Sequence, residues 1–204
     1  MKSSKEEIRR QIARHTHSPS EKMKAGLGLL SNVQNLEAFK NASTILSFLS
    51  LDDEISTEEI TKSIMNSSKS LALPRICGNG MDFYILTHDK SLEHQIETGQ
   101  YKIREPKKNL LQLQKTDIDP TCVVLFPGRA FTADGKRLGR GKGYYDKYFL
   151  PFLSELKHQK PLFIGTCYEA QITGTIPCES HDIVMDCIVT EQNIRFCLKP
   201  PLHA

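Results

Sequence analysis

Stretches of strand length alternate with stretches of helical character over most of the chain, and this alternation restricts the folds open to it. The apolar run from Cys122 to Phe126 is typical of a strand buried on both faces, and a helix is expected from Tyr144 to about Lys157. Other strands are expected at residues 43–50, 70–74, 81–86, 162–167, 186–190 and 194–197. Because parallel strands need crossover connections, the alternation predicts an α/β fold: a three-layer, open, mostly parallel sheet with helices on both faces.

Two capping boxes predict a pair of helices at the N-terminus. Ser4 stands three residues before Glu7, and Ser18 stands three residues before Glu21. In this pattern the serine side chain and the glutamate side chain each satisfy a backbone N–H group that the first turn of a helix leaves unpaired. We expect the second helix to continue to about Phe39.

Three further segments complete the expected order of elements. Ser56 with Glu59 forms another capping pattern and predicts a helix through about Asn66. The range Glu97–Pro120 is polar and poor in strand signals, so we expect a long excursion over the surface. Near the C-terminus, a short helix containing Glu169 is expected before the last strands.

The length and composition of the chain fit one globular domain, residues 1–204. With 204 residues and 39% apolar content, such a domain buries roughly 70% of the surface of its unfolded chain. The formal net charge of +3 does not by itself indicate a nucleic-acid partner. No secretory signal is visible at the start, and no run approaches the roughly 20 apolar residues that span a bilayer. We therefore expect a soluble, cytoplasmic protein without a membrane partner.

The chain has six cysteines but no Cys-x-x-Cys pair of the kind that structural zinc sites use. Cys122 and Cys167 lie in apolar runs that are expected to be core strands, where free thiols behave as small apolar side chains. The cysteines therefore favour free thiols over a structural zinc site.

The loop after the strand Cys122–Phe126 carries the strongest signal for chemistry, because ligands of open α/β sheets gather at the carboxyl ends of strands. Three glycines alternate with two cations immediately before a helix, in the order Gly139, Arg140, Gly141, Lys142 and Gly143. Glycines let backbone N–H groups approach a phosphate, and the helix start and the cations add positive charge. The pattern predicts a site for a polyphosphate.

Composition alone also allows this loop to be a flexible, solvated basic turn. Cations beside a helix start are electrostatically unfavourable unless an anion binds, which favours the binding loop. The loop is not a Walker A motif, because five residues rather than four separate Gly135 from Gly141, and Gly143 replaces the usual Ser or Thr. In the following helix Tyr148 is predicted to face the core, whereas Tyr144 could equally line a site.

The string PGRAFTADGKRLGRGKGYYD, residues 127–146, closely resembles the signature of the 5-formyltetrahydrofolate cyclo-ligase family, also called 5,10-methenyltetrahydrofolate synthetase. The resemblance covers nearly the whole chain, in the order typical of the family. Its other parts are Lys5-x-x-x-Arg9, FLSLDDEI at residues 48–55, LPR at 73–75, Met81-Asp82, Glu105-Pro106 and IPCESHDIVMDCIVTE from residue 176.

The resemblance implies that the chain uses ATP and Mg²⁺ to convert 5-formyltetrahydrofolate, with or without a polyglutamate tail, into 5,10-methenyltetrahydrofolate, ADP and phosphate. It implies catalytic roles for Arg140 and Lys142 and metal-binding roles for Asp146 and Asp182. The positions expected to contact the nucleotide are Lys5, Arg9, Arg137, Leu138, Gly139, Arg140, Gly141, Lys142, Gly143, Tyr144 and Tyr145. The positions expected to contact the folate are Leu49, Glu54, Met81, Tyr101 and Tyr144.

Simpler explanations exist for several of these side chains. Lys5 and Arg9 are also compatible with a solvated helix face, and Glu54 with a carboxylate that favours the start of the next helix. Asp146 suits a helix start in the same way. Where the family commonly has an Asp after Pro-Gly-x-Ala-Phe, this chain has Thr132, so the task of that carboxylate is in question here.

Two other functions are compatible with parts of the sequence. Sugar-phosphate isomerases and acyl-CoA transferases also bind phosphates on α/β folds, but their activities should not need ATP. A nucleic-acid-binding module would use the basic segment Arg129–Lys147 with its tyrosines as stacking groups, and its binding to single strands would be sensitive to salt. The modest net charge and the candidate metal-binding aspartates favour the enzyme without a nucleic-acid partner.

Overall fold

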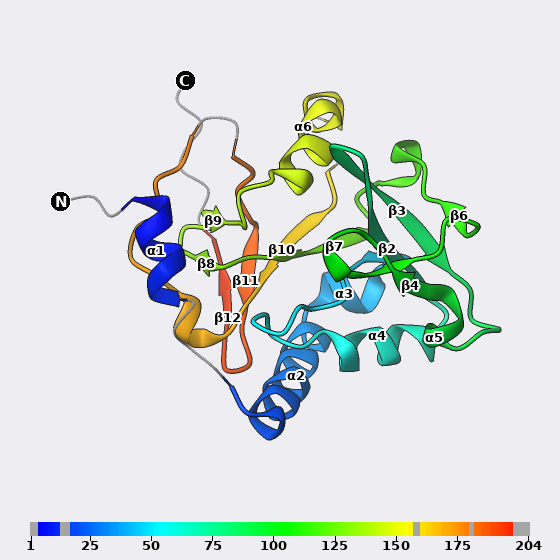
Figure 1. Ribbon diagram of the computed structural model, residues 1–204, viewed down its shortest axis with the longest axis horizontal. Helices are drawn as coiled ribbons and strands as arrows, with labels where there is room; N and C mark the ends of the chain where they lie inside the picture. Colours follow the sequence, from blue (N-terminus) through cyan, green and yellow to red (C-terminus); the bar gives the residue numbers. More distant parts are fainter. Residues whose placement is uncertain (1–3, 13–16, 157–159, 180–181, 198–204) are drawn as a thin grey trace.

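One eight-stranded sheet forms the centre of the protein (Figure 1). The structure, a computed structural model, describes residues 4–12, 17–156, 160–179 and 182–197. From one edge to the other the strands are β12 (Ile194–Phe196), β11 (Cys187–Val189), β10 (Leu162–Thr166), β7 (Cys122–Pro127), β1 (Thr44–Leu46), β2 (Ser70–Cys77), β3 (Gly80–Leu86) and β6 (Leu111–Gln112). The strands from β11 to β2 are parallel to one another, and the outer pairs are antiparallel. The prediction of an open, mostly parallel sheet is confirmed.

Helices cover both faces of this sheet, as predicted (Figure 1). One face packs against α2 (Pro19–Gln34), α3 (Glu37–Asn41) and α4 (Glu58–Met65), and the other packs against α6 (Tyr144–Leu156). A one-turn helix, α5 (Leu92–Gln95), follows β3. The expected end of the last long helix at Lys157 lies outside the described residues. Among the helices in the described ranges, none combines the length and the apolar content that a membrane span requires.

Strand β7 shows why the sheet needs two covered faces. Val123 and Leu125 belong to the core on the α2 side, whereas Val124 and Phe126 belong to the core on the α6 side. All four side chains are at most 1% exposed. Because side chains alternate between the two faces of a strand, a continuous apolar run is stable only when both faces are buried.

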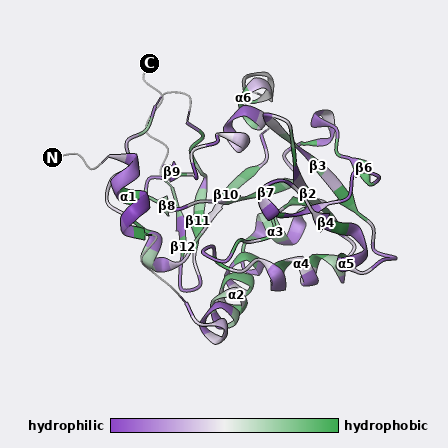
Figure 2. Cartoon of the chain, in the orientation of Figure 1, coloured by the Kyte–Doolittle hydropathy of each residue, from purple (hydrophilic) through white to green (hydrophobic). Residues whose placement is uncertain are grey.

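The two N-terminal helices begin as the capping boxes predict. In α1 (Lys5–Ile12), Glu7 N–H donates to the Ser4 hydroxyl at 3.2 Å and Ser4 N–H donates to the Glu7 carboxylate at 2.8 Å. Ser18 caps α2 in the same manner. Helix α1 is largely hydrophilic, in contrast to β10 (Figure 2), and it buries Ile8 against a hairpin of β8 (Ala130–Phe131) and β9 (Arg137–Leu138).

Two helix predictions are wrong in detail. The second helix does not reach Phe39, because α2 ends at Gln34 and Leu36 adopts an extended conformation before α3 begins. The break lets Leu36 and Phe39 both enter the core. At α4 the N-cap is Thr57 rather than Ser56, and its hydroxyl donates to the carbonyl of Phe48 at 2.5 Å instead of capping the helix.

Two strand predictions also change. The run at residues 43–50 pairs as a strand only over Thr44–Leu46, after which the chain leaves the sheet and Phe48 turns toward a cavity. The range Glu97–Pro120 contains more structure than expected: β4 (Ile96–Thr98) pairs with β5 (Arg104–Pro106), and β6 extends the main sheet beside β3. Short pairings with few apolar residues leave little periodic signal in a sequence.

The remaining short elements are 3-10 helices. The expected helix containing Glu169 is η3 (Glu169–Gln171), which lies between β10 and β11. The other two, η1 (Gln100–Lys102) and η2 (Lys115–Asp117), lie within the excursion that follows β4. In η1, Tyr101 and Lys102 both have positive φ angles, of 57° and 59°.

Candidate active site

A cavity of about 690 Å³ lies where the parallel strands end. Its walls include Leu49 after β1, Ile76 at the end of β2 and Gly128 after β7. Carboxyl ends of parallel strands are the usual place for ligands in open α/β sheets. The structure brings every residue expected at the site to this one cavity: Lys5, Arg9, Leu49, Glu54, Met81, Tyr101, Arg137, Leu138, Gly139, Arg140, Gly141, Lys142, Gly143, Tyr144, Tyr145, Asp146 and Asp182. Their individual roles stay predictions.

The glycine-rich loop between β9 and α6 forms one wall of the cavity. Gly141 and Gly143 have φ angles of +97° and +66°, which side chains other than glycine rarely adopt. The loop is tied to helix α1, because the Nε of Arg9 donates to the carbonyl of Gly139 at 3.0 Å. Helix α6 begins directly after Gly143, so its positive end faces the same space as the loop.

Arg137 lies at the base of this loop in an almost buried position. Its Nη2 donates to Asp146 Oδ2 at 2.9 Å, and only 8% of the arginine side chain is exposed. The guanidinium also lies 5.6 Å from the ring centroid of Phe126 and 5.7 Å from that of Tyr145. Asp146 accepts a second hydrogen bond from the N–H of Ile183 at 3.3 Å. These contacts fix the base of the loop to the first turn of α6.

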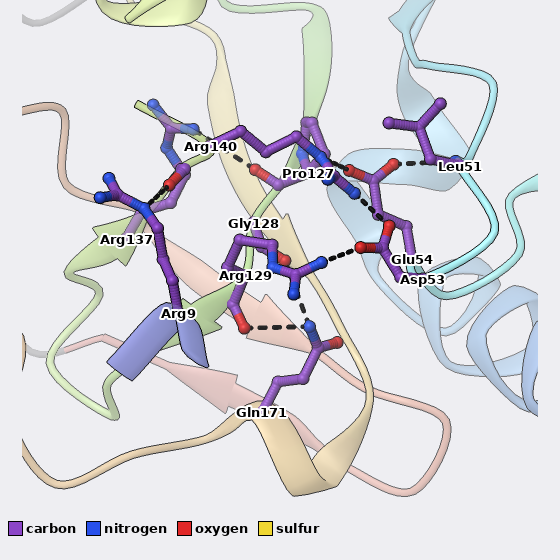
Figure 3. A network of polar contacts seen from close by, with 11 residues as sticks. Arg9, Leu51, Asp53, Glu54, Pro127, Gly128, Arg129, Arg137, Arg140 and Gln171 are labelled. Carbon is purple, nitrogen blue, oxygen red and sulfur yellow. Dashed lines mark hydrogen bonds and ion pairs between the residues drawn. The ribbon is translucent and has the colours of Figure 1, made fainter. Parts of the chain in front are cut away.

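Arg140, at the tip of the loop, is held by two carboxylates (Figure 3). Its Nε donates to Glu54 Oε1 at 3.1 Å, and its Nη2 pairs with Asp53. Glu54 is oriented in turn by the N–H of Leu51, which donates to Oε2 at 3.0 Å. Asp53 also pairs with Arg129. Burial alone raises the pKa of Asp53, but the hydrogen bond and charge of Arg140, followed by those of Arg129, outweigh burial and hold that pKa below its ordinary value.

Two carboxylates of the cavity could hold a divalent cation. Asp146 lies at the start of α6, and Asp182 accepts from Lys5 Nζ at 3.1 Å and from Glu179 N–H at 2.9 Å. Among the described residues no three His, Cys, Asp or Glu side chains gather as a complete metal site. Mg²⁺ usually takes one or two carboxylates and completes its coordination with phosphates and water, so Asp146 and Asp182 stay the candidate ligands.

Another part of the cavity wall is more apolar. Met81, at the start of β3, is buried, whereas Tyr101 is 63% exposed. The Nζ of Lys142 lies 5.6 Å from the centroid of the Tyr101 ring. Tyr144 also reaches this side, where its hydrogen bond with Tyr101 raises the pKa of the Tyr144 hydroxyl. Two tyrosines and a methionine thus provide flat and apolar surface beside the charged loop.

Tyr145 lies in a different environment from its neighbour Tyr144. Its ring packs 5.1 Å from that of Phe126, and its buried hydroxyl has no hydrogen-bond partner within the described part of the protein. Burial raises the pKa of this hydroxyl. Tyr145 therefore supports the cavity wall from the apolar core. The prediction that Tyr148 faces the core is confirmed, since it is 4% exposed.

Glu105, Asp53 and Arg129 are among the residues near the site that were not predicted from the sequence. Glu105 lines the cavity and is only 1% exposed, and burial raises its pKa. Asp53 and Arg129 lie behind Arg140. The Asp-Asp-Glu run and the Glu-Pro pair contain two of these positions, and Arg129 lies in the family-like string at residues 127–146, where no role was predicted for it. Thr132 is buried, accepts from Lys136 N–H at 3.0 Å and bonds Asp134, so it braces the turn before β9.

The fold and the cavity define an α/β protein whose ligand site combines a glycine-rich cationic loop, two carboxylates and an apolar wall. Residues 1–191 match the 5-formyltetrahydrofolate cyclo-ligase family. The chain belongs to this family of ligases.

Several members of this family are similar to this chain over most of its length. It is 31% identical over 178 residues to 5-formyltetrahydrofolate cyclo-ligase of Mus musculus, covering 86% of this chain and 87% of the mouse protein. The Saccharomyces cerevisiae cyclo-ligase is 32% identical over 173 residues, with 77% and 80% covered. The structure of Aquifex aeolicus 5,10-methenyltetrahydrofolate synthetase superposes with a TM-score of 0.77 at 28% identity, covering 98% of this chain and 96% of that one.

Proposed function

We propose that the protein converts 5-formyltetrahydrofolate into 5,10-methenyltetrahydrofolate and consumes ATP in a Mg²⁺-dependent reaction. The observation that carries this proposal is the meeting of a cationic glycine loop, two carboxylates and an apolar wall in one cavity of a cyclo-ligase family member. The substrate carries its formyl group on N5, and the product joins that carbon to N10. ADP and phosphate are the other products.

The chemical difficulty lies in the formyl oxygen, which is a poor leaving group. Transfer of the γ-phosphoryl group to this oxygen makes it a good one, and ADP departs. N10 then attacks the formyl carbon and loses its proton to solvent or phosphate, and phosphate leaves with the former formyl oxygen. The protein must align the formyl oxygen with the γ-phosphorus and stabilise negative charge as it spreads over the phosphoryl oxygens.

The residues of the loop suit that electrostatic task. Lys142 is exposed at the cavity wall, and Arg140 is oriented by Glu54. Their cations would stabilise the transferring phosphoryl group, while the N–H groups of the loop and the start of α6 would bind the nucleotide phosphates. Lys5 and Arg9 reach the same cavity from α1 and would add charge for the phosphate tail.

The carboxylates and the apolar wall would bind the metal ion and the folate. Asp146 and Asp182 would hold Mg²⁺, which supplies charge neutralisation for the phosphates when bound. Glu54 can accept hydrogen bonds from the N–H groups of a pterin ring. Leu49, Met81 and Tyr101 would pack against the pterin or aminobenzoyl rings of the folate.

We further propose that residues 1–204 work as one domain in the cytoplasm, without a nucleic-acid or membrane partner. Strands from both halves of the chain share one sheet, which supports a single unit. All six cysteines are free thiols, as is usual for proteins of reducing compartments. The substrate is expected to be accepted with or without a polyglutamate tail.

A direct assay tests this function. Purified protein, MgATP and 5-formyltetrahydrofolate are mixed, and the absorbance of methenyltetrahydrofolate is followed, with ATP omitted as a control. We expect product only when ATP is present, with one ADP formed per product. An isomerase or transferase would not depend on ATP, and a nucleic-acid-binding module would consume no ATP in response to folate. Folded protein that forms no product would refute the proposal.

A further inference from the structure

Asp53 lies between two arginines that come from different parts of the chain (Figure 3). One is Arg140 at the tip of the glycine-rich loop, and the other is Arg129 after strand β7. Each guanidinium contacts a different oxygen of the carboxylate. A single carboxylate thus links the loop tip to the protein interior.

Arg129 is the fixed end of this link. Only 8% of its side chain is exposed, compared with 40% for Arg140. The backbone of Arg129 is also held on both sides, because its N–H donates to the carbonyl of Leu138 at 2.7 Å and its carbonyl accepts from Gln171 Nε2 at 3.0 Å. A buried side chain on a fixed backbone is a firm support for Asp53.

The loop tip needs such a support. Gly139, Gly141 and Gly143 leave its backbone with little side-chain packing, and Gly141 and Lys142 are exposed. A glycine-rich backbone samples many conformations, so a cation on it contributes most when its direction is set in advance. Glu54 alone cannot fully set this direction if its carboxylate also receives the folate.

Neither Asp53 nor Arg129 lines the main cavity. Both border a neighbouring open hollow of about 480 Å³, together with Glu6, Arg9, Arg10 and Arg140. Arg140 and Arg9 line both spaces, and of these two Arg140 is the one paired with Asp53, so Arg140 connects Asp53 to the main cavity. This placement separates them from residues that touch the substrates.

We propose that Asp53 and Arg129 are positioning residues, which fix the guanidinium of Arg140 in the direction that the transferring phosphoryl group requires. The proposal rests on the proposed function, because it assigns a support to one of the residues that would carry out the phosphoryl transfer. Arg129 sets the place of Asp53, and Asp53 sets the place of Arg140. Supporting residues of this kind determine whether a site has the geometry that its chemistry needs.

A double-mutant cycle on kcat/KM for ATP tests this chain of support. Asp53→Asn is expected to lower kcat/KM about 10- to 100-fold, because a misplacement of about 1 Å can cost about 100-fold. Arg129→Gln should give a smaller loss in the same direction, and adding it to Asp53→Asn should change little. With Arg140→Gln already present, assayed at raised enzyme concentration, Asp53→Asn should have almost no further effect.

Two matched variants serve as controls. Asp52→Asn changes the neighbouring exposed carboxylate, which has no ion pair within the described ranges, and should leave kcat/KM unchanged. Asp53→Glu keeps an acceptor for both arginines and should recover most of the lost activity. Thermal unfolding of each variant shows whether it is folded, and a merely structural role would reduce stability without the dependence on Arg140.

The proposal is overturned if Asp53→Asn lowers kcat/KM by the same factor with glutamine at position 140 as with arginine. It is also overturned if Asp53→Asn behaves like Asp52→Asn. If the unaltered protein forms no methenyltetrahydrofolate, the proposed function fails instead. The same cycle is then measured on the affinity for MgATP by calorimetry, where independence of Asp53 and Arg140 again counts against the positioning role.

Discussion

The base and the tip of the glycine-rich loop present their cations in opposite ways. At the base, Arg137 is 8% exposed and is paired with Asp146 above the aromatic rings of the core. At the tip, Arg140 is 40% exposed. The Nζ of Lys142 lies 5.6 Å from the ring centroid of the exposed Tyr101. The base therefore belongs to the folded framework, whereas the cations of the tip are exposed to a ligand.

This contrast teaches that charge on a loop can serve stability or function according to its burial. A buried ion pair must stay paired, since removal of one partner leaves an unpaired charge in a medium of low polarity. A solvent-exposed cation loses little stability when it is removed, because water already screens it. Removal of the exposed cation at the tip should consequently alter turnover more than folding, and loss of the ion pair at the base should reduce the stability of the fold.

The largest effect is expected from Lys142→Ala at the tip. We predict that kcat falls about 100- to 1000-fold, as when one donor to a developing negative charge is removed. The melting temperature should hardly change. Steady-state turnover and thermal unfolding measure the two quantities, with the exposed Lys147→Ala on α6 as the matched control. A large loss of stability in Lys142→Ala would contradict the division between tip and base.

Asp146→Ala tests the base. We predict that the free energy of unfolding in urea, without Mg²⁺, falls by about 3 kcal/mol, because Arg137 is left buried and unpaired. Replacing Arg137 by Met in the same protein should recover part of this loss, since no unpaired charge then remains. If Asp146→Ala unfolds like the unaltered protein, the base is not a structural ion pair.

Asp182→Asn distinguishes the two carboxylates. Asp182 is paired with Lys5 from the terminal helix, and both side chains are partly exposed. We predict that the Mg²⁺ concentration needed for half-maximal activity rises about tenfold, with little change in unfolding. Activity is measured over a Mg²⁺ titration at fixed ATP. Unchanged activity would remove Asp182 from the metal site.

Gly141→Ala tests the backbone of the tip. The φ angle of +97° is strained for alanine, so we predict a loss of about 1–2 kcal/mol in unfolding free energy, together with reduced turnover. Gly174→Ala is the control, because a methyl group there meets no atom within 4 Å and its φ angle is not in the left-handed region. Equal stability of the two variants would show that the tip does not require its glycine.

The smallest effect is expected on the unfolding free energy when the pH is lowered. The pKa of Asp53 is held below its ordinary value of 3.8, so its pairing with Arg140 and Arg129 stabilises the folded state fully above about pH 3.8. This contribution is lost as the pH falls through the lower pKa of the folded protein. The unfolding free energies of the unaltered protein and Asp53→Asn should therefore converge as the pH falls. A constant difference would indicate that Asp53 is not paired as a carboxylate.

Much of the fold could be predicted from local patterns. The buried strand β7, the capped starts of α1 and α2, and the order of strands and helices all depend on neighbouring residues. The break after Gln34 and the early end of β1 could not be predicted, because each depends on packing against distant segments. Short strands β4 and β5 pair mainly through backbone groups, which every sequence possesses.

The sequence by itself determined that a strand, a glycine-rich cationic loop and a helix follow one another, because these features arise from residues close together in the chain. Only the tertiary structure decided which distant side chains meet that loop. Lys5 and Asp182 form an ion pair although they lie 177 positions apart. Asp53, from a different loop, pairs with both Arg129 and Arg140. Such meetings depend on how the whole sheet folds, since side-chain contacts of this kind require separated segments to be brought within a few ångströms.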